Sequence, residues 1–232
     1  ASDDGTGAIT TAYAYTWHSG TFQVEEHTTT LPAVSVGENG SGTSAARKLW
    51  FDERGSLVWS MDELGRVTYR HYDSVTGRMD KTIEDIDDAT ADALELDIPA
   101  GWTLPASGGV NATTDYEYDA FGRITEILGP AHTADIGGTP TNVRTAVWTF
   151  YNDAAHETRS AQGYALAESP YTETIVGPVS ITKTDRDGRT TEQIQATYTG
   201  DLEDLAAATI NQSDYTAWNT SQYANTRLAS SR

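Results

Sequence analysis

The side chains that could do chemistry in this chain are mostly carboxylates, because its 232 residues include 34 Asp and Glu, five His and no Cys. The lack of Cys excludes disulfides, thiol catalysis and cysteine-based zinc sites within this sequence. The histidines do not have the spacing of metal ligands, and His156-Glu157 begins like a metalloprotease motif without a second His four residues later. We therefore predict no metal centre and no cofactor. The five histidines are His18, His27, His71, His132 and His156.

Two glutamates, Glu117 and Glu126, could form the carboxylate pair that glycoside hydrolysis requires. The sequence predicts that they lie on facing strands of one hairpin, where solvent-exposed charge is the ordinary explanation. The sequence contains neither a G-x-S-x-G nucleophile motif nor a phosphate-binding loop. We predict no catalytic residues and no enzymatic activity.

An acidic stretch, residues 80–97, raises the question of calcium. It has eight acidic residues and a single Lys, and its centre reads Asp85-Ile86-Asp87-Asp88. Dedicated calcium loops space their ligands alternately and include a glycine and a terminal Glu, which this stretch lacks. We interpret it as a solvated acidic edge, and the sequence leaves calcium binding open.

A second group of aspartates recurs with a glycine at a fixed offset. An Asp at the first position of a β-turn accepts hydrogen bonds from backbone N–H groups ahead of it, and the glycine tolerates the positive φ that leads into the next strand, often through a bulge. Each copy therefore predicts a β-hairpin. The predicted turn residues are Asp52, Gly55, Asp62, Gly65, Arg66, Asp73, Gly77, Arg78, Tyr118, Asp119, Gly122, Arg123, Asp185, Gly188 and Arg189.

These turns are flanked by strand-forming residues, and those from Asp52 to Asp73 are about ten residues apart. This spacing is typical of a meander of short antiparallel strands. The Arg that follows most of the glycines begins the return strand, and we expect it to reach aromatic faces or acidic groups of a neighbouring hairpin.

The unit Tyr-Asp-x-x-Gly-Arg resembles the tyrosine–aspartate (YD) repeat of the RHS and teneurin-like proteins. Residues 118–123 match it in full, whereas 62–66 and 185–189 match without the Tyr. Residues 72–78 match with one insertion, and 52–56 lack the Arg. The stretches between the repeats, such as residues 102–105 and 191–197, are similar to those of the very large RHS-repeat surface proteins of planctomycete bacteria.

Composition supports an all-β chain and excludes several partners. The 12 Tyr, 6 Trp and 4 Phe favour strands, and long helix-forming runs are missing. A net charge of -19 argues against nucleic acid, which requires clustered Lys and Arg, and against anionic membranes. No apolar run is long enough to span a bilayer, so we expect no membrane insertion.

The predicted fold class is therefore all-β, with antiparallel β-hairpin (YD) repeats forming a meandering, curved or solenoid-like sheet interrupted by irregular loop inserts. We interpret residues 1–232 as a single YD-repeat region and expect it to be a piece of a much longer chain. Its predicted parts are a divergent repeat (8–46), core repeats (47–84), a loop insert (85–114), a repeat (115–128), a loop insert (129–142), repeats (143–199) and a C-terminal segment (200–232).

Finer features follow from the same signals. Two strands are expected around Gly20, one or two helical turns within residues 89–96, and a degenerate copy of the turn at residues 152–159. Trp102 is expected to anchor the insert that contains it. Residues 200–208 could form a short helix or a loop.

Three classes of function are consistent with this sequence. We favour a non-catalytic extracellular or cell-surface protein, structural or adhesive, whose end strands pair with flanking repeats of the same long chain or with identical copies, as in a surface fibre or shell. The resemblance also implies a second class, part of an RHS protein of a toxin system, in which the repeats form a shell around a C-terminal toxin. The third class is a carbohydrate-binding or polysaccharide-active surface protein, with cell-surface glycans as partners.

Overall fold

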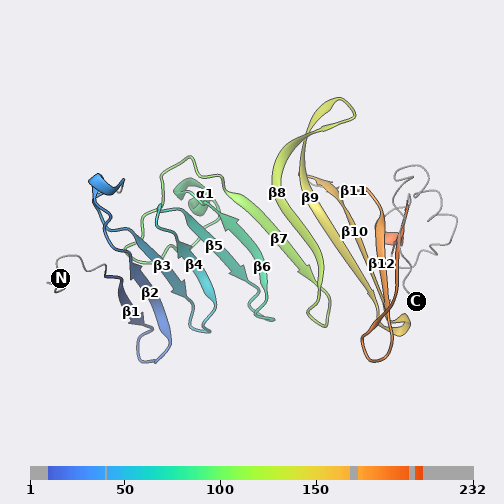
Figure 1. Ribbon diagram of the computed structural model, residues 1–232, viewed down its shortest axis with the longest axis horizontal. Helices are drawn as coiled ribbons and strands as arrows, with labels where there is room; N and C mark the ends of the chain where they lie inside the picture. Colours follow the sequence, from blue (N-terminus) through green and yellow to red (C-terminus); the bar gives the residue numbers. More distant parts are fainter. Residues whose placement is uncertain (1–9, 40, 168–171, 199–201, 206–232) are drawn as a thin grey trace, which may run out of the picture. The chain divides into compact units, whose positions relative to one another are not determined.

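The structure is a computed structural model that describes residues 10–39, 41–167, 172–198 and 202–205. These residues form thirteen β-strands, one short α-helix and three 3-10 helices (Figure 1). Every strand pairing with a defined register is antiparallel. The all-β antiparallel fold class predicted from the sequence is thereby confirmed. No helix among the residues that the structure describes has the length and apolar character needed to cross a bilayer.

The chain divides into two compact units, residues 1–113 and 114–232. In the first unit, six strands hydrogen-bond in chain order as a meander (Figure 1). They are β1 (Ala12–Trp17), β2 (Val24–Thr30), β3 (Ala46–Phe51), β4 (Leu57–Met61), β5 (Val67–Tyr72) and β6 (Met79–Glu84). Gly20, in the turn between β1 and β2, has φ +75°, and the loop that follows β2 contains a 3-10 helix, η1 (Val36–Glu38).

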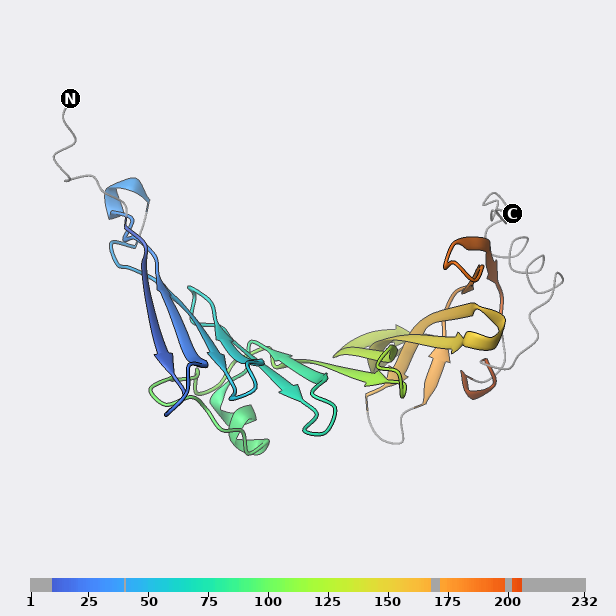
Figure 2. The same cartoon turned by 90° about the horizontal axis from the view of Figure 1, so that it is seen from below.

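One face of this first sheet is covered and carries the core of the unit. Strand residues alternate between the two faces, and on the covered face Trp59, Val67 and Ile83 are buried. The cover is the insert after β6, which contains helix α1 (Asp88–Ala93) (Figure 2). Asp87 caps α1 by accepting the N–H of Thr90 at 2.9 Å, which explains why a helix begins at this point of the acidic stretch.

Hydrogen bonds from two indole N–H groups connect the insert to the sheet. Trp59 Nε1 donates to the carbonyl of Asp97 at 3.1 Å, and Trp102 Nε1 donates to Glu26 Oε2 at 2.6 Å. Trp102 is only 8% exposed, and the Lys48 ammonium lies 5.7 Å from the centre of its ring. The predicted role of Trp102 as an anchor is confirmed, and the anchor is a buried side chain with a polar end.

The second unit begins within β7 and contains longer strands. Its strand order is β7-β8-β9-β10-β12-β13, and β11 pairs with β10. A core of small and branched residues packs around the buried Trp148. The strands are β7 (Ala112–Tyr118), β8 (Ile124–Ile136), β9 (Thr139–Asn152), β10 (Glu157–Leu166), β11 (Glu173–Ile175), β12 (Val179–Thr184) and β13 (Thr190–Ala196), and the 3-10 helices are η2 (Asp153–Ala155) and η3 (Leu202–Asp204).

The prediction of a loop insert at 129–142 is wrong. These residues belong to β8 and β9, which meet in a turn at Gly137 and Gly138, where φ is +62° and +87°. The register shifts between Leu128 and Ala131, so that Gly129 and Pro130 lie in a bulge. A bulged proline needs no partner for its missing N–H, so glycine and proline in this stretch shape a hairpin without ending its strands.

Two further predicted segments correspond to elements of the structure. The core repeats at 47–84 correspond to β3–β6, and the insert at 85–114 contains α1 and ends where β7 begins at Ala112. Of the expected C-terminal segment, the structure describes residues 202–205, which form η3 and the turn after it, and the rest of that prediction lies outside the described residues.

Candidate functional site

The aspartates of four predicted turns make the same pair of hydrogen bonds. In each turn one carboxylate oxygen accepts the backbone N–H groups of the residues two and four positions further on, at 2.7 to 3.0 Å. Asp73 opens the longer copy, and its Oδ1 accepts the N–H of Val75 at 3.2 Å and the N–H and hydroxyl of Thr76 at 2.6 and 2.7 Å. The four equivalent residues are Asp52, Asp62, Asp119 and Asp185.

The glycine of each turn supplies the backbone conformation predicted for it. All five glycines have φ between +70° and +86°, and in four of the hairpins the strand register shifts beside the Asp, as expected for a bulge. These glycines are Gly55, Gly65, Gly77, Gly122 and Gly188. The aspartates and glycines therefore act on the backbone of their own hairpin.

A further turn of this kind joins β9 to β10 without the expected residues. Asn152 takes the place of the Asp and accepts the N–H of Ala155 at 3.2 Å. His156 takes the place of the glycine with φ +51°. The order Tyr151-Asn152, followed by His156 four residues after Asn152, matches Tyr72-Asp73 followed by Gly77. The degenerate copy predicted at residues 152–159 is thus a copy of the longer turn.

The tyrosine of the motif links one hairpin to the strand before it. Tyr72 donates its hydroxyl to the carbonyl of Leu57 at 3.1 Å, and Tyr151 donates to the carbonyl of Ile124 at 3.2 Å. Both acceptors lie five residues after a turn aspartate, at the first residue of the neighbouring strand. The tyrosine at this position of the motif therefore makes the same contact in both units.

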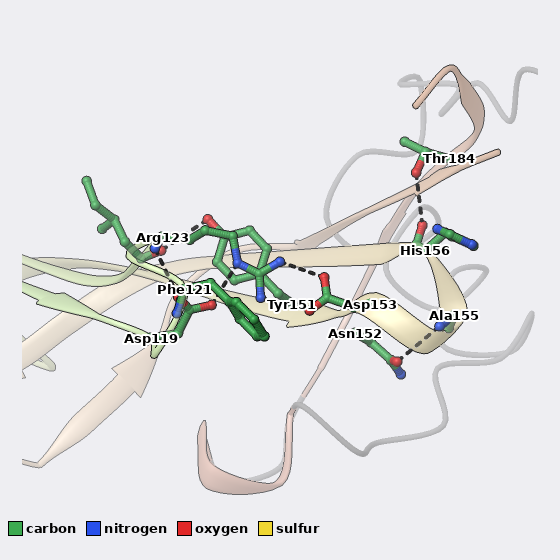
Figure 3. Close-up of polar contacts among 10 residues, drawn as sticks. Asp119, Phe121, Arg123, Tyr151, Asn152, Asp153, Ala155, His156 and Thr184 are labelled. Carbon is green, nitrogen blue, oxygen red and sulfur yellow. Dashed lines mark hydrogen bonds and ion pairs between the residues drawn. The ribbon is translucent and has the colours of Figure 1, made fainter. Parts of the chain in front are cut away.

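The arginine of the full motif makes the most extensive of these contacts (Figure 3). Arg123 donates through Nε to Asp119 in its own turn at 2.7 Å, and through both terminal nitrogens to Asp153 in the next turn at 2.6 and 3.1 Å. Its guanidinium lies 4.0 Å from the centre of the Tyr151 ring and 5.3 Å from that of Phe121. Hydrogen bonds from Arg123 lower the pKa of Asp153. The expectation that this arginine contacts a neighbouring hairpin is confirmed at Arg123.

Two other turn arginines, Arg66 and Arg189, behave differently. Arg189 donates to Asp187 of its own turn at 3.2 Å, with both side chains largely exposed. The guanidinium of Arg66 makes no ion pair with the residues that the structure describes. In the first copy, which lacks the final Arg, Arg54 instead donates to the carbonyl of Ser74 in a neighbouring turn at 3.0 Å.

The carboxylate pair Glu117 and Glu126 lies directly opposite across the β7–β8 hairpin, as predicted. Glu117 is exposed, whereas Glu126 is half-buried and accepts Nε1 of the core residue Trp148 at 2.6 Å. Burial raises the pKa of Glu126, and the charges of Glu117 and Glu173 act in the same direction. Solvent-exposed charge therefore describes Glu117 but not Glu126, which is a polar contact at the rim of the core.

Three of the histidines, and the aspartates at the centre of the acidic stretch, make hydrogen bonds to other protein groups. His18 hydrogen-bonds the carbonyl of Phe51, His71 hydrogen-bonds Asp80, and His132 hydrogen-bonds the carbonyl of Pro130. In the acidic stretch, hydrogen bonds led by those from Thr90 lower the pKa of Asp87 to about 2, and Asp85 accepts the N–H of Val110. Within the part of the chain that the structure describes, no three His, Asp or Glu residues are grouped as metal ligands.

The structure also brings together residues that the sequence did not single out. The face of the first sheet opposite the one that the α1 insert covers, which we call the uncovered face, has no such insert over it among the described residues. A hollow of about 640 Å³ there is lined by residues of β3 to β6 and by Val110 and Ala112. Toward the edge of the same sheet, β1 exposes Tyr13, Tyr15 and Trp17, which are 63%, 47% and 54% exposed. The alternation of these three aromatic residues was visible in the sequence, but the face on which they lie depends on strand pairings far apart in the chain.

No model of a protein family matches this chain, and no curated protein matches it.

Proposed function

We propose that the chain is a non-catalytic structural or adhesive β-repeat protein of the cell surface or extracellular space, related to the RHS and YD-repeat proteins. The observation that carries the proposal is the recurrence of one turn, with the same aspartate hydrogen bonds and the same glycine conformation, in both compact units. These residues serve the hairpin itself. A repeated unit that stabilises its own backbone suits a scaffold that grows by adding further hairpins.

The outer strands indicate how such a scaffold would extend. Among the described residues, β1 pairs only with β2 and β13 only with β12, so each has one edge of backbone N–H and C=O groups outside these pairings. All six residues of β1 are exposed. Natural proteins cover such edges or pair them. We propose that these edges pair with flanking repeats of one long chain or with identical copies.

Self-association of the purified chain tests this proposal. We expect light scattering and electron microscopy to show concentration-dependent end-to-end assemblies, since β-strand addition joins one edge to another. Ala14→Lys in β1 and Gln193→Lys in β13 place a charge on each edge and should abolish assembly. Ala120→Lys, in an exposed turn, is the matched control and should leave assembly intact. A chain that stays monomeric and monodisperse at high concentration would contradict the assembly of identical copies.

A further inference from the structure

The uncovered face of the first sheet presents a continuous row of side chains across five strands. Directly opposed residues of neighbouring strands lie on the same face of a sheet. The row begins with Tyr15 opposite His27, and continues through Leu49 and Ser60 to Thr68 on β5. The aromatic edge strand and the hollow therefore belong to one surface, about 10 Å apart at the usual spacing of strands.

The aromatic end of this surface is a stacked platform. The rings of Tyr15 and His27 are 4.7 Å apart and nearly parallel, at 5°, and the rings of Tyr13 and His27 are also stacked, at 6.1 Å. Trp17 lies 6.4 Å from Tyr15. Large aromatic rings held in place by one another, yet half exposed, offer apolar area at little cost in side-chain entropy.

The hollow at the other end is polar and carries both signs of charge. Arg66 and the exposed Glu84 line it, and neither makes an ion pair with the described residues. Arg47 is already neutralised by two hydrogen bonds to Glu63, at 2.7 and 2.9 Å. The hydroxyls of Ser60 and Thr68 are also part of the lining. The carboxylates of Asp62 and Asp85 line it as well, and both accept hydrogen bonds from backbone N–H groups. The site therefore contains donors and acceptors and does not favour an anionic ligand.

A ligand that suits both ends has an apolar ring face and many neutral hydroxyls. The C–H face of a sugar ring stacks on an aromatic ring, while its hydroxyls both donate and accept hydrogen bonds. An acidic sugar would meet the carboxylates of Glu84 and Asp85, and a cationic ligand would meet Arg66. We propose that this face of the first unit binds a neutral oligosaccharide, which stacks on Tyr15 and Trp17 and reaches the hollow past β2.

This proposal goes beyond the structural role proposed above, because it assigns a ligand and its site. Calorimetric titration of the whole chain tests it, with cellohexaose, hexa-N-acetylchitohexaose and mannohexaose as neutral probes and an oligogalacturonate as the charged probe. We expect at least one neutral hexasaccharide to bind with a Kd below millimolar, more tightly than its trisaccharide and than the oligogalacturonate.

Variants assign the binding to this surface. Tyr15→Ala and Trp17→Ala should each weaken binding about five- to ten-fold, because each removes one stacked ring. Phe22→Ala is the control, since Phe22 is fully exposed in the turn next to the platform. Arg66→Gln and Thr68→Val should weaken binding by removing hydrogen bonds in the hollow, whereas Arg189→Gln, at the same motif position in the second unit, should not.

The proposal is overturned if no neutral hexasaccharide binds below millimolar concentration, or if the two aromatic variants bind as well as the parent chain. Tighter binding of a proline-rich peptide to the same platform would also overturn it, because aromatic surfaces accommodate such peptides as well. Sugar binding and self-association are measured separately, so failure of either proposal is distinguishable from failure of the other.

Discussion

Single aspartate and glycine residues fix the path of this chain because their interactions are local. A turn aspartate accepts hydrogen bonds from the N–H groups two and four residues ahead, so its role can be predicted from the sequence alone. The contact between Glu126 and Trp148 could not be predicted in this way. The two residues are 22 positions apart, and they meet only because β8 and β9 pair in one particular register.

The first prediction at this scale concerns the turn glycine. Gly122→Val should destabilise the second unit by about 2 kcal/mol, because φ at this position is +86° and a β-branched residue resists a left-handed backbone. Ala120→Val in the same turn is the control and should change stability by less than about 0.5 kcal/mol. Urea unfolding followed by tyrosine and tryptophan fluorescence measures both. Equal stability of the two variants would contradict the role assigned to the glycine.

The second prediction uses the one turn that lacks its glycine. His156 adopts φ +51°, which costs an ordinary residue more than it costs glycine. His156→Gly should therefore stabilise the chain by roughly 0.5 kcal/mol, after the greater freedom of glycine in the unfolded state is taken into account. Ala154→Gly adds the same freedom without relieving strain and should destabilise. Thermal unfolding of the two variants and the parent gives the comparison, and a lower Tm for His156→Gly would disprove the strain argument.

The third prediction concerns pH. Burial raises the pKa of Glu126 above its ordinary value of 4.5, so the folded chain holds this proton at pH values where the unfolded chain has released it. The contribution of Glu126 to stability therefore falls as the pH rises from about 4.5 through the folded pKa. Glu126→Gln keeps an acceptor for Trp148 but does not titrate, so its stability relative to the parent should increase between pH 4 and pH 7. A difference that does not change with pH would contradict the pKa shift.

At the scale of elements, strand signals were reliable, whereas the glycine and proline signals were misleading at residues 129–142. Alternation and the Asp-x-x-Gly turns located β3 to β6, because each hairpin is specified by adjacent residues. Gly129 and Pro130 are residues typical of a loop and led to the prediction of one, although they lie in a bulge between two strands. The physical difference is Arg144, which donates to the carbonyls of Leu128 and Gly129 at 2.8 and 2.7 Å. This arginine is 15 or more residues away in sequence, so the bulge could not be inferred from its own residues.

The fourth prediction follows from that contact. The Arg144 side chain is 10% exposed and also pairs with Asp115 at 2.7 Å. Arg144→Met should cost roughly 3 kcal/mol, because it leaves a carboxylate and two carbonyls without their donor. Arg189→Met removes an exposed arginine whose ion pair is solvated, and should cost less than about 0.5 kcal/mol. Chemical unfolding of the two variants measures the difference, and similar losses would show that the bulge does not depend on Arg144.

At the scale of the whole molecule, the net charge opposes self-association, whereas the strand edges outside the described pairings favour it. The net charge of -19 makes copies of the chain repel, whereas the proposed edge pairing uses neutral backbone groups. The composition predicted the repulsion. The composition could not show which strands lie at the edges. Identifying β1 and β13 as the edge strands of the described pairings required the complete strand order, which only the structure gives.

The last prediction concerns the effect of salt on self-association. Raising the ionic strength from about 0.01 M to 0.15 M shortens the screening length from roughly 30 Å to 8 Å and weakens repulsion between copies. Backbone hydrogen bonds between β1 and β13 carry no net charge and are little affected, so assembly should strengthen with salt. Sedimentation velocity at the two ionic strengths measures the change, with the Ala14→Lys and Gln193→Lys double variant as the control that should stay monomeric. Weaker assembly at high salt would indicate an interface held by ion pairs, and would exclude the pairing of strand edges as its main cause.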